Sequence, residues 1–416
     1  MRSGRAATLI SIAAVAVVAA CALVFALTSL QQDLAAYWVA GAARRAGLDP
    51  YVNNAAAGAK VAWDGSGFRH SRFLYPPLAA ELLRPLAALP YRAAKLLFTA
   101  GALAAWVVTA TLLARGPRVS AALLGAGALF FPLYFHLERG QIDLLLLPLV
   151  LGAWRMKHRP TLAGALFAAA AMIKPALLGA LPAIAGLGHR RWATWTVGAA
   201  AAALLMTAVV SGPALLREYA GVVLPRAALY GESGSEGMAL HERDLEGLVD
   251  GGEGDTQVMD GRSYRYVVAP FDRPASASLP RVLAPESPSW PTSLLPYLVA
   301  AGAMVWAGRR VARGGAGRDD DDDDDDAQLM LFVAALVACV VASRTGWVMG
   351  FVWALPIAPL VLRLSASGTT SPWPLRAVIG AGIACALPAP FAGWPAMAGA
   401  VLAVAAGAMA IGRARA

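Results

Sequence analysis

The sequence predicts an all-α polytopic membrane protein. Hydrophobic residues make up 58% of the 416 residues, the mean hydropathy is +0.57, and the first apolar segment runs without a charge from Ala6 to Leu30. Soluble domains contain only about 45–50% apolar residues, and a helix of about 20 residues crosses the hydrocarbon core of a bilayer. We therefore expect a bundle of membrane-spanning helices.

The first predicted span, within residues 1–30, is longer than the apolar region of a signal peptide, which has about 7–15 residues. No small-residue cleavage pattern precedes the next charged residue, so we expect this segment to stay in the mature protein. Arg2 and Arg5 come before it, and basic residues favour the cytoplasmic side. The amino terminus is predicted to be cytoplasmic.

The chain has a net charge of +9 and a pI near 9.8. We attribute this positive charge to basic residues that orient the protein in the membrane, and we expect no nucleic-acid partner. The arginines occur in short groups between apolar runs, as the excess of basic residues on cytoplasmic loops requires. Pairing the spans between these groups places both termini in the cytoplasm. It gives about twelve helices, at residues 6–30, 93–114, 119–135, 142–155, 160–173, 175–188, 193–212, 292–308, 327–343, 346–362, 376–391 and 395–412.

Two long segments are predicted on the extracytoplasmic side, at residues 31–92 and 213–291. The first is expected to contain interfacial helices at 33–45, with Tyr37 and Trp38 at headgroup depth, and at 78–90. The second is predicted to open with a surface helix at 213–229. Its stretch 231–260 has the Gly-rich, charged composition of a lid or a partly disordered loop.

Two groups of spans, at residues 93–212 and 292–416, flank the second outer segment. A run of eight aspartates, Asp319 to Asp326, lies on the predicted cytoplasmic side. We interpret it as a solvated, self-repelling linker, with calcium binding or a regulatory contact as the alternative. The three cysteines lie in apolar segments and offer no metal-ligand spacing, so neither a metal nor a cofactor is expected.

The distribution of carboxylates indicates where chemistry could occur. Of the 26 acidic residues, eight form the aspartate run and twelve lie between Glu218 and Glu286. The other six all face the outer side in this topology, and an ionisable group at membrane depth is a functional candidate. Asp33, at the mouth of the first span, is the candidate general base. The remaining five acids are Asp49, Asp64, Glu81, Glu138 and Asp143.

Glu138 and Asp143 flank a tight turn at the tips of two spans, and that turn also contains Gln141. All three are candidate substrate-binding residues. The alternative for Glu138 is that it neutralises the adjacent Arg139.

Lys174 and Arg344 are the candidate contacts for a phosphate group. Lys174 precedes Pro175 between two apolar segments, where a compact ammonium and the start of the next helix suit an anion. Its alternative role is snorkelling to the lipid headgroups. Arg344 follows an apolar run and precedes Trp347 on the predicted outer side.

Several stretches in order along the chain resemble the polyprenol-phosphate-dependent glycosyltransferases of family 87, which have the GT-C membrane fold. They are Asp33-Leu-Ala-Ala-Tyr37, Gly47-Leu-Asp-Pro-Tyr51, Tyr75-Pro-Pro-Leu78, Gly140-Gln-Ile-Asp143, Ile173-Lys-Pro175, and Gly346-Trp347 with Leu355-Pro356. The resemblance implies an inverting enzyme that moves a sugar, mannose or arabinofuranose, from a polyprenyl-phosphate donor to a glycolipid or cell-envelope glycan. Asp33 would be the base, with Tyr75 and Trp347 among the substrate contacts.

The expected location is a bacterial cytoplasmic membrane, with the active site on the outer side and membrane lipids around the bundle. Two alternatives remain. A lipid or solute transporter also needs many helices and buried charges, although transporters tend to show repeated halves and no repeat is visible in this sequence. An inactive GT-C-like scaffold is suggested by Gly346 to Gly350, where relatives often carry Ser-Trp followed by His.

Overall fold

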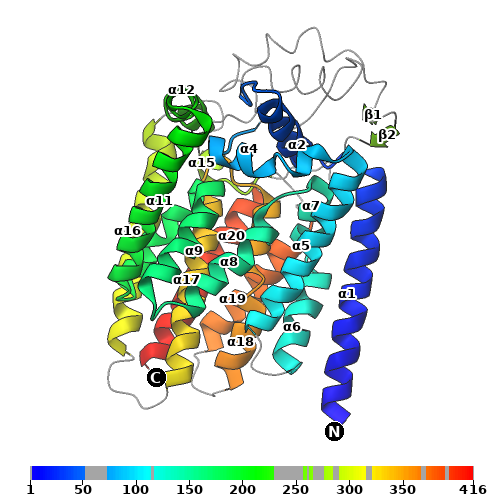
Figure 1. Cartoon of the computed structure of the whole chain (residues 1–416). Helices are drawn as coiled ribbons and strands as arrows, with labels where there is room; N and C mark the ends of the chain where they lie inside the picture. Colours follow the sequence, from blue (N-terminus) through cyan, green and yellow to red (C-terminus); the bar gives the residue numbers. More distant parts are fainter. Residues whose placement is uncertain are drawn as a thin grey trace.

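The structure is a computed structural model that describes residues 2–51, 73–113, 117–228, 256–259, 262–265, 276–283, 290–314, 321–366, 372–388 and 393–415. The described part of the chain is almost entirely helical and forms a bundle of roughly aligned helices (Figure 1). The α-helices are α1 (Arg2–Thr28), α2 (Gln32–Arg45), α4 (Pro77–Leu83), α5 (Tyr91–Leu113), α6 (Pro117–Ala128), α7 (Phe131–Arg139), α8 (Asp143–Arg155), α9 (Pro160–Ile173), α10 (Leu181–Gly186), α11 (Arg190–Ser211), α12 (Pro213–Glu218), α13 (Leu224–Ala228), α15 (Leu279–Leu283), α16 (Trp290–Gly314), α17 (Asp321–Ala342), α18 (Ile357–Ala366), α19 (Pro372–Ala386) and α20 (Trp394–Arg415).

Shorter helical turns connect several of these helices. The 3-10 helices are η1 (Leu86–Ala88), η2 (Pro175–Ala180) and η5 (Val348–Ala354). The π-helical turn η3 (Tyr219–Val223) joins α12 to α13, so the surface helix predicted at 213–229 is a helical stretch with a π turn inside it.

Every predicted span contains a helix, but the number of helices long enough to cross a bilayer is smaller than twelve. Six helices of the described chain are long and apolar enough, or up to seven if the bent pair α6 and α7 counts as one span. That pair bends by 67° between its two halves. The helices between residues 143 and 186 are too short to qualify, because prolines and polar turns interrupt the apolar sequence there. The protein is a polytopic membrane protein with several helices packed inside its bundle.

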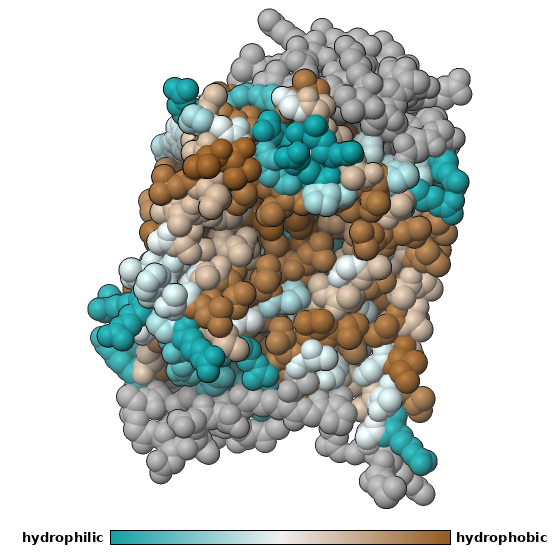
Figure 2. Space-filling view, in the orientation of Figure 1, coloured by the Kyte–Doolittle hydropathy of each residue, from teal (hydrophilic) through white to brown (hydrophobic). Residues whose placement is uncertain are grey.

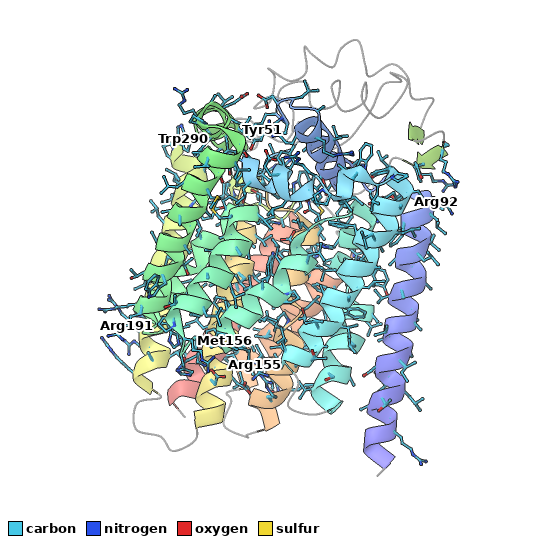
Figure 3. All side chains as sticks on the ribbon, in the orientation of Figure 1. Tyr51, Arg92, Arg155, Met156, Arg191 and Trp290 are labelled. Carbon is cyan, nitrogen blue, oxygen red and sulfur yellow. The ribbon has the colours of Figure 1, made fainter. Side chains whose placement is uncertain are left out.

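The two ends of the bundle differ in what they carry. Tyr51 and Trp290 lie at one end, and Arg155 and Arg191 lie at the other (Figure 3). The amino and carboxyl termini lie near the second end (Figure 1). An apolar band crosses the middle of the visible face, with hydrophilic side chains toward the ends (Figure 2). We call the end of Tyr51 the upper end.

Helix α2 does not lie on the membrane surface as predicted, because protein covers it. Residues 32–43 are all buried, and Tyr37 and Trp38 are only 1% and 4% exposed. The sequence allows this close packing at Gly41, where a Cβ atom would lie 2.7 Å from the carbonyl oxygen of Leu83. Tyr37 and Trp38, which were predicted to lie at the depth of the lipid headgroups, are instead packed inside the protein at the upper end.

The all-α prediction missed a short antiparallel hairpin in the segment 213–291, the second of the two segments predicted to be extracytoplasmic. Strands β1 (Thr256–Met259) and β2 (Arg262–Arg265) pair in a two-stranded sheet. Residues 256–259 belong to the stretch predicted as a lid, and the rest of that stretch lies outside the described residues. A parallel bridge joins Arg265 to Ser29, directly after α1.

The aspartate run is not a solvated linker where the structure describes it. Residues 321–326 form the first turns of α17. Asp325 pairs with Lys157, and Asp326 pairs with Arg363 at 2.6 Å. The end of the run therefore ties α17 to neighbouring helices.

Candidate functional site

The candidate base Asp33 lies in a hydrogen-bonded group of side chains at the upper end. Gln141 Nε2 donates to Asp33 Oδ2 at 2.9 Å. The amide oxygen of Gln141 accepts from the Tyr37 hydroxyl at 2.9 Å and from the Tyr75 hydroxyl at 3.3 Å. The two hydroxyls lie 2.7 Å apart. With the amide oxygen toward the two phenols, the amide nitrogen faces Asp33, and Asp33 Oδ2 accepts its hydrogen bond.

The α7–α8 turn delivers Gln141 to Asp33 because it begins with a glycine. Gly140 has φ 67° and ends α7 in the left-handed conformation that glycine adopts most readily. A Cβ atom here would lie 2.7 Å from Leu34 Cβ and 3.0 Å from Gln31 Cβ. Any side chain would push α2 away from the turn, so the glycine permits the Gln141–Asp33 contact.

The environment keeps both phenols protonated and able to donate. Burial, with smaller effects from Tyr75 and the Asp33 charge, raises the pKa of Tyr37 well above its usual value. Burial also raises the pKa of Tyr75, and the charges of Asp33 and Asp143 add to the shift. Both carboxylates therefore act on Tyr75, which places Asp143 in the same group as Asp33.

Asp143 begins α8 and is fully buried, but it is paired. Lys174 Nζ lies 2.5 Å and 2.7 Å from its two oxygens. Trp353 Nε1, from η5, donates to Oδ1 at 2.6 Å. Lys174 stands in a break between α9 and η2, because the residue before Pro175 is disfavoured in a helix. The Lys174 ammonium is paired with Asp143, and its predicted contact with a phosphate, like the alternative of snorkelling, stays a prediction.

Glu138 lies beside this group. It accepts from the Ser29 hydroxyl at 2.8 Å, and Arg139 Nε is 3.5 Å from its other oxygen. The predicted alternative, a pairing with Arg139, is present. Glu138 is therefore placed to hold the end of α1 against α7.

Arg344 and Trp347 form a second group, between α17 and η5. Arg344 donates to Ser293 Oγ at 2.9 Å and to Thr292 Oγ1 at 3.2 Å, both in α16. Arg281, from α15, stacks its guanidinium over the Trp347 ring at 4.8 Å. Burial, and then the charge of Arg281, lower the pKa of Arg344. Two arginines at one place make this a strongly cationic group.

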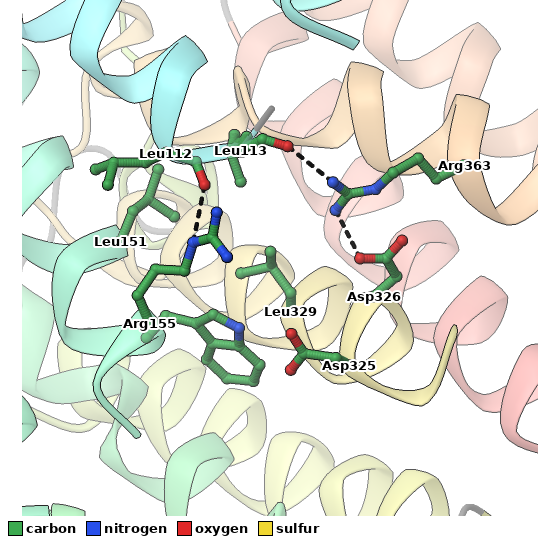
Figure 4. A pocket seen from close by; sticks show the side chains of 9 residues that line it. Leu112, Leu113, Leu151, Arg155, Asp325, Asp326, Leu329 and Arg363 are labelled. Carbon is green, nitrogen blue, oxygen red and sulfur yellow. Dashed lines mark hydrogen bonds and ion pairs between the residues drawn. The ribbon is translucent and has the colours of Figure 1, made fainter. Parts of the chain in front are cut away.

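A cavity at the opposite end of the bundle has a structural role. It holds about 20 Å³, room for about one water molecule. Arg155 donates to the carbonyl of Leu112, and Arg363 donates to that of Leu113, so two arginines cap the last turn of α5 (Figure 4). The cavity is remote from Asp33, and the two carboxylates that line it, Asp325 and Asp326, are paired with Lys157 and Arg363.

The described residues contain no group of three His, Cys, Asp or Glu side chains that could hold a metal ion. The described cysteines are free, and Cys339 and Cys385 are buried. The side chains that the two upper-end groups offer to a substrate are thus carboxylates, phenols, an amide and cations.

Comparison with known proteins supplies the class of activity. Residues 73–246 match the model of glycosyltransferase family 87. The predicted family resemblance is confirmed, and the family activity is that of a glycosyltransferase. No curated protein and no solved structure matches the chain. Of the candidate residues, the match covers Tyr75, Glu138, Gln141, Asp143 and Lys174.

Sequence reasoning misses the role of three residues in these two groups: Tyr37, which it places at the headgroups, and Trp353 and Arg281, which it does not single out. Trp353 is far from Asp143 in sequence, so no spacing rule connects them. Tyr37 follows Asp33 by four residues, which puts the two side chains on one face of a helix. That spacing is the one signal that could have found Tyr37.

A separate carboxyl pair lies near Tyr51 at the upper end. Glu218, at the end of α12, shares a hydrogen bond with Asp49. Nearby, the Tyr51 and Tyr219 rings stack with centroids 6.0 Å apart. Burial first, then the hydrogen bond and charge of Asp49, raise the pKa of Glu218 to about 7.

We expect the stability of the protein to decrease as the pH rises from about 5 to about 7, because Glu218 keeps its proton in the folded state at a pH where the unfolded chain releases it. Thermal unfolding midpoints in detergent, measured at several pH values for wild type and Glu218→Gln, test this. The variant should lose part of the pH dependence. Identical pH profiles would contradict the assignment.

Replacing Lys174 by Met should destabilise the protein by roughly 2–4 kcal/mol, because it leaves the Asp143 carboxylate buried without its cation. The double variant Asp143→Asn with Lys174→Met should recover a large part of this loss, since no buried charge remains. Thermal unfolding in detergent measures both. Additive losses in the double variant would show that the ion pair is not what stabilises this junction.

Proposed function

We propose that the protein is an inverting glycosyltransferase that uses a polyprenyl-phosphate sugar on the extracytoplasmic side of the membrane. The observation that carries this proposal is the Asp33–Gln141 hydrogen bond, which holds a carboxylate in the first turn of α2 at the upper end. The family match supports the class of reaction. The upper end is then the outer side.

Asp33 is the proposed general base. It would take the proton of the acceptor hydroxyl while that oxygen attacks the anomeric carbon and the bond to the phosphate oxygen breaks. The positive end of the α2 dipole and the Gln141 amide favour the ionised carboxylate. A positioned base of this kind contributes roughly 10²- to 10⁴-fold to a rate.

The base is held in place by Gln141 and by the two phenols, Tyr37 and Tyr75. The ion pair of Asp143 and Lys174 lies beside them and forms part of the same polar site. In this proposal Lys174 neutralises Asp143, and Glu138 orients the turn through Ser29. The substrate contacts are polar groups of Gln141, Tyr75 and Asp143.

Arg344 is the proposed contact for the phosphate of the donor, supported by Arg281 over Trp347. Two guanidinium groups would stabilise the negative charge that grows on the leaving phosphate. The 3-10 helix η5 begins after Trp347 and carries Trp353 to Asp143. At a rise of about 2 Å per residue the two tryptophans are on the order of 12 Å apart, a span that a sugar phosphate and an acceptor can bridge together.

The donor sugar is proposed to be mannose or arabinofuranose, and the acceptor a glycolipid or glycan of a bacterial cell envelope. In the described residues, every group assigned to the candidate site lies at the upper end, and the ion pairs of Asp325 and Asp326 lie at the other end. This asymmetry favours an enzyme over a transporter.

Asp33→Asn should lower the rate of sugar transfer roughly 10²- to 10⁴-fold, because the amide keeps the shape but cannot accept a proton. The assay is transfer from radiolabelled polyprenyl-phosphate mannose or arabinofuranose to lipid acceptors in membranes. Asp49→Asn, which changes a carboxylate outside the site, is the matched control and should keep wild-type turnover. Full activity in Asp33→Asn would remove the base assignment.

Arg344→Gln should raise the KM for the lipid-phosphate donor about 10- to 100-fold, because a charge-assisted hydrogen bond to a phosphate is worth about 1.5–3 kcal/mol. Arg310→Gln, in the exposed part of α16, is the control. Donor KM values from the same transfer assay give the comparison. An unchanged donor KM would place the phosphate elsewhere.

A further inference from the structure

The junction between α1 and α2 is almost completely buried. Ser29, Leu30 and Gln31 are 0%, 0% and 1% exposed. Gln31 has φ 55°, a left-handed conformation that a residue other than glycine keeps only where its surroundings impose it. Asp33 follows two residues later, so the direction of its side chain depends on how this junction is held.

Two side chains of α5 hold the junction by donating hydrogen bonds to its backbone carbonyl groups. Lys95 Nζ donates to the Ser29 carbonyl oxygen, and the Tyr91 hydroxyl donates to the Leu30 carbonyl oxygen at 2.5 Å. Lys95 is 0% exposed. A fully buried ammonium is costly unless other groups stabilise it.

The β1–β2 hairpin provides part of that stabilisation. The Tyr264 ring lies with its centroid 3.9 Å from Lys95 Nζ, a close cation–π contact. The Leu30 amide donates to the Arg265 carbonyl at 2.7 Å. Tyr264 is the buried residue of β2, and its three neighbours in the strand are exposed. The hairpin therefore attaches to the junction through one side chain and one backbone contact.

We propose that Lys95 and Tyr264 are positioning residues for Asp33, and that docking of the β1–β2 hairpin fixes the base. This proposal rests on the proposed function of Asp33. The chain of contacts is continuous. Tyr264 covers the Lys95 ammonium, and Lys95 donates to the Ser29 carbonyl oxygen. The junction fixed in this way directly precedes α2, which carries Asp33 in its first turn. The second outer segment thereby controls the geometry of the base that the first outer segment carries.

The proposal assigns a specific chemical task to each residue. The aromatic face of Tyr264 is needed, whereas its hydroxyl is not. The hydrogen bond of Lys95 is needed to fix the carbonyl, and the exposed side chains of β2 are not needed. A base moved by about 1 Å loses roughly 10²-fold in rate, and such a loss affects turnover more than binding of the donor.

The test compares Tyr264→Leu with Tyr264→Phe, and uses Ser263→Ala as the control for an exposed position of β2. The full-length protein in membranes should show a kcat lowered roughly 10- to 100-fold in Tyr264→Leu, with the donor KM changed by less than about twofold. Tyr264→Phe and Ser263→Ala should behave as wild type. Lys95→Met should reproduce the loss.

Hydrogen–deuterium exchange gives a readout that does not need activity. Amides of residues 29–36 should exchange faster in Tyr264→Leu than in Tyr264→Phe, while peptides of α8 and α17 stay unchanged. Unchanged exchange at 29–36 would overturn the proposal, and so would faster exchange with an unchanged kcat. Asp33→Asn is measured alongside: if it stays active, the base assignment fails, while the exchange data still decide whether the hairpin holds the junction.

Discussion

The pairing of buried polar groups is the constraint on which this structure depends. A carboxylate, an amide and two phenols occupy the interior of the upper end, and each has a partner within hydrogen-bonding distance. An apolar bundle in a membrane offers no water to replace a missing partner. Gly140 makes the arrangement possible, because it lets α2 lie against the α7–α8 turn. The candidate chemistry and the stability of this end therefore rest on the same contacts.

The sequence predicted the positions of the helices well, and it selected several polar residues that are neighbours in the fold. Uninterrupted apolar runs define helices, and a carboxylate at the tip of a span stands out against such a background. Asp33, Gln141, Tyr75 and Asp143 do lie together. Each of them stands at a position that the sequence itself marks, such as the end of an apolar run or a turn between two runs.

The sequence could not predict which polar groups would pair across long separations. Lys174 meets Asp143 only after α8 and α9 pack, and Trp353 reaches the same carboxylate from η5. The same limit explains the misinterpreted aspartate run, since its cationic partners Lys157 and Arg363 lie on other helices. The hairpin was missed because its strands have only four residues each, too few for a clear alternation.

The ion pair of Asp143 and Lys174 has an evolutionary consequence. Loss of either residue alone leaves an uncompensated charge inside the protein. A lineage that replaces one of the two residues first therefore passes through a variant that folds poorly. The pair should therefore be retained or exchanged as a unit among descendants of this gene, for example as two neutral residues. An isolated change at one of the two positions would mark a copy that has ceased to fold efficiently.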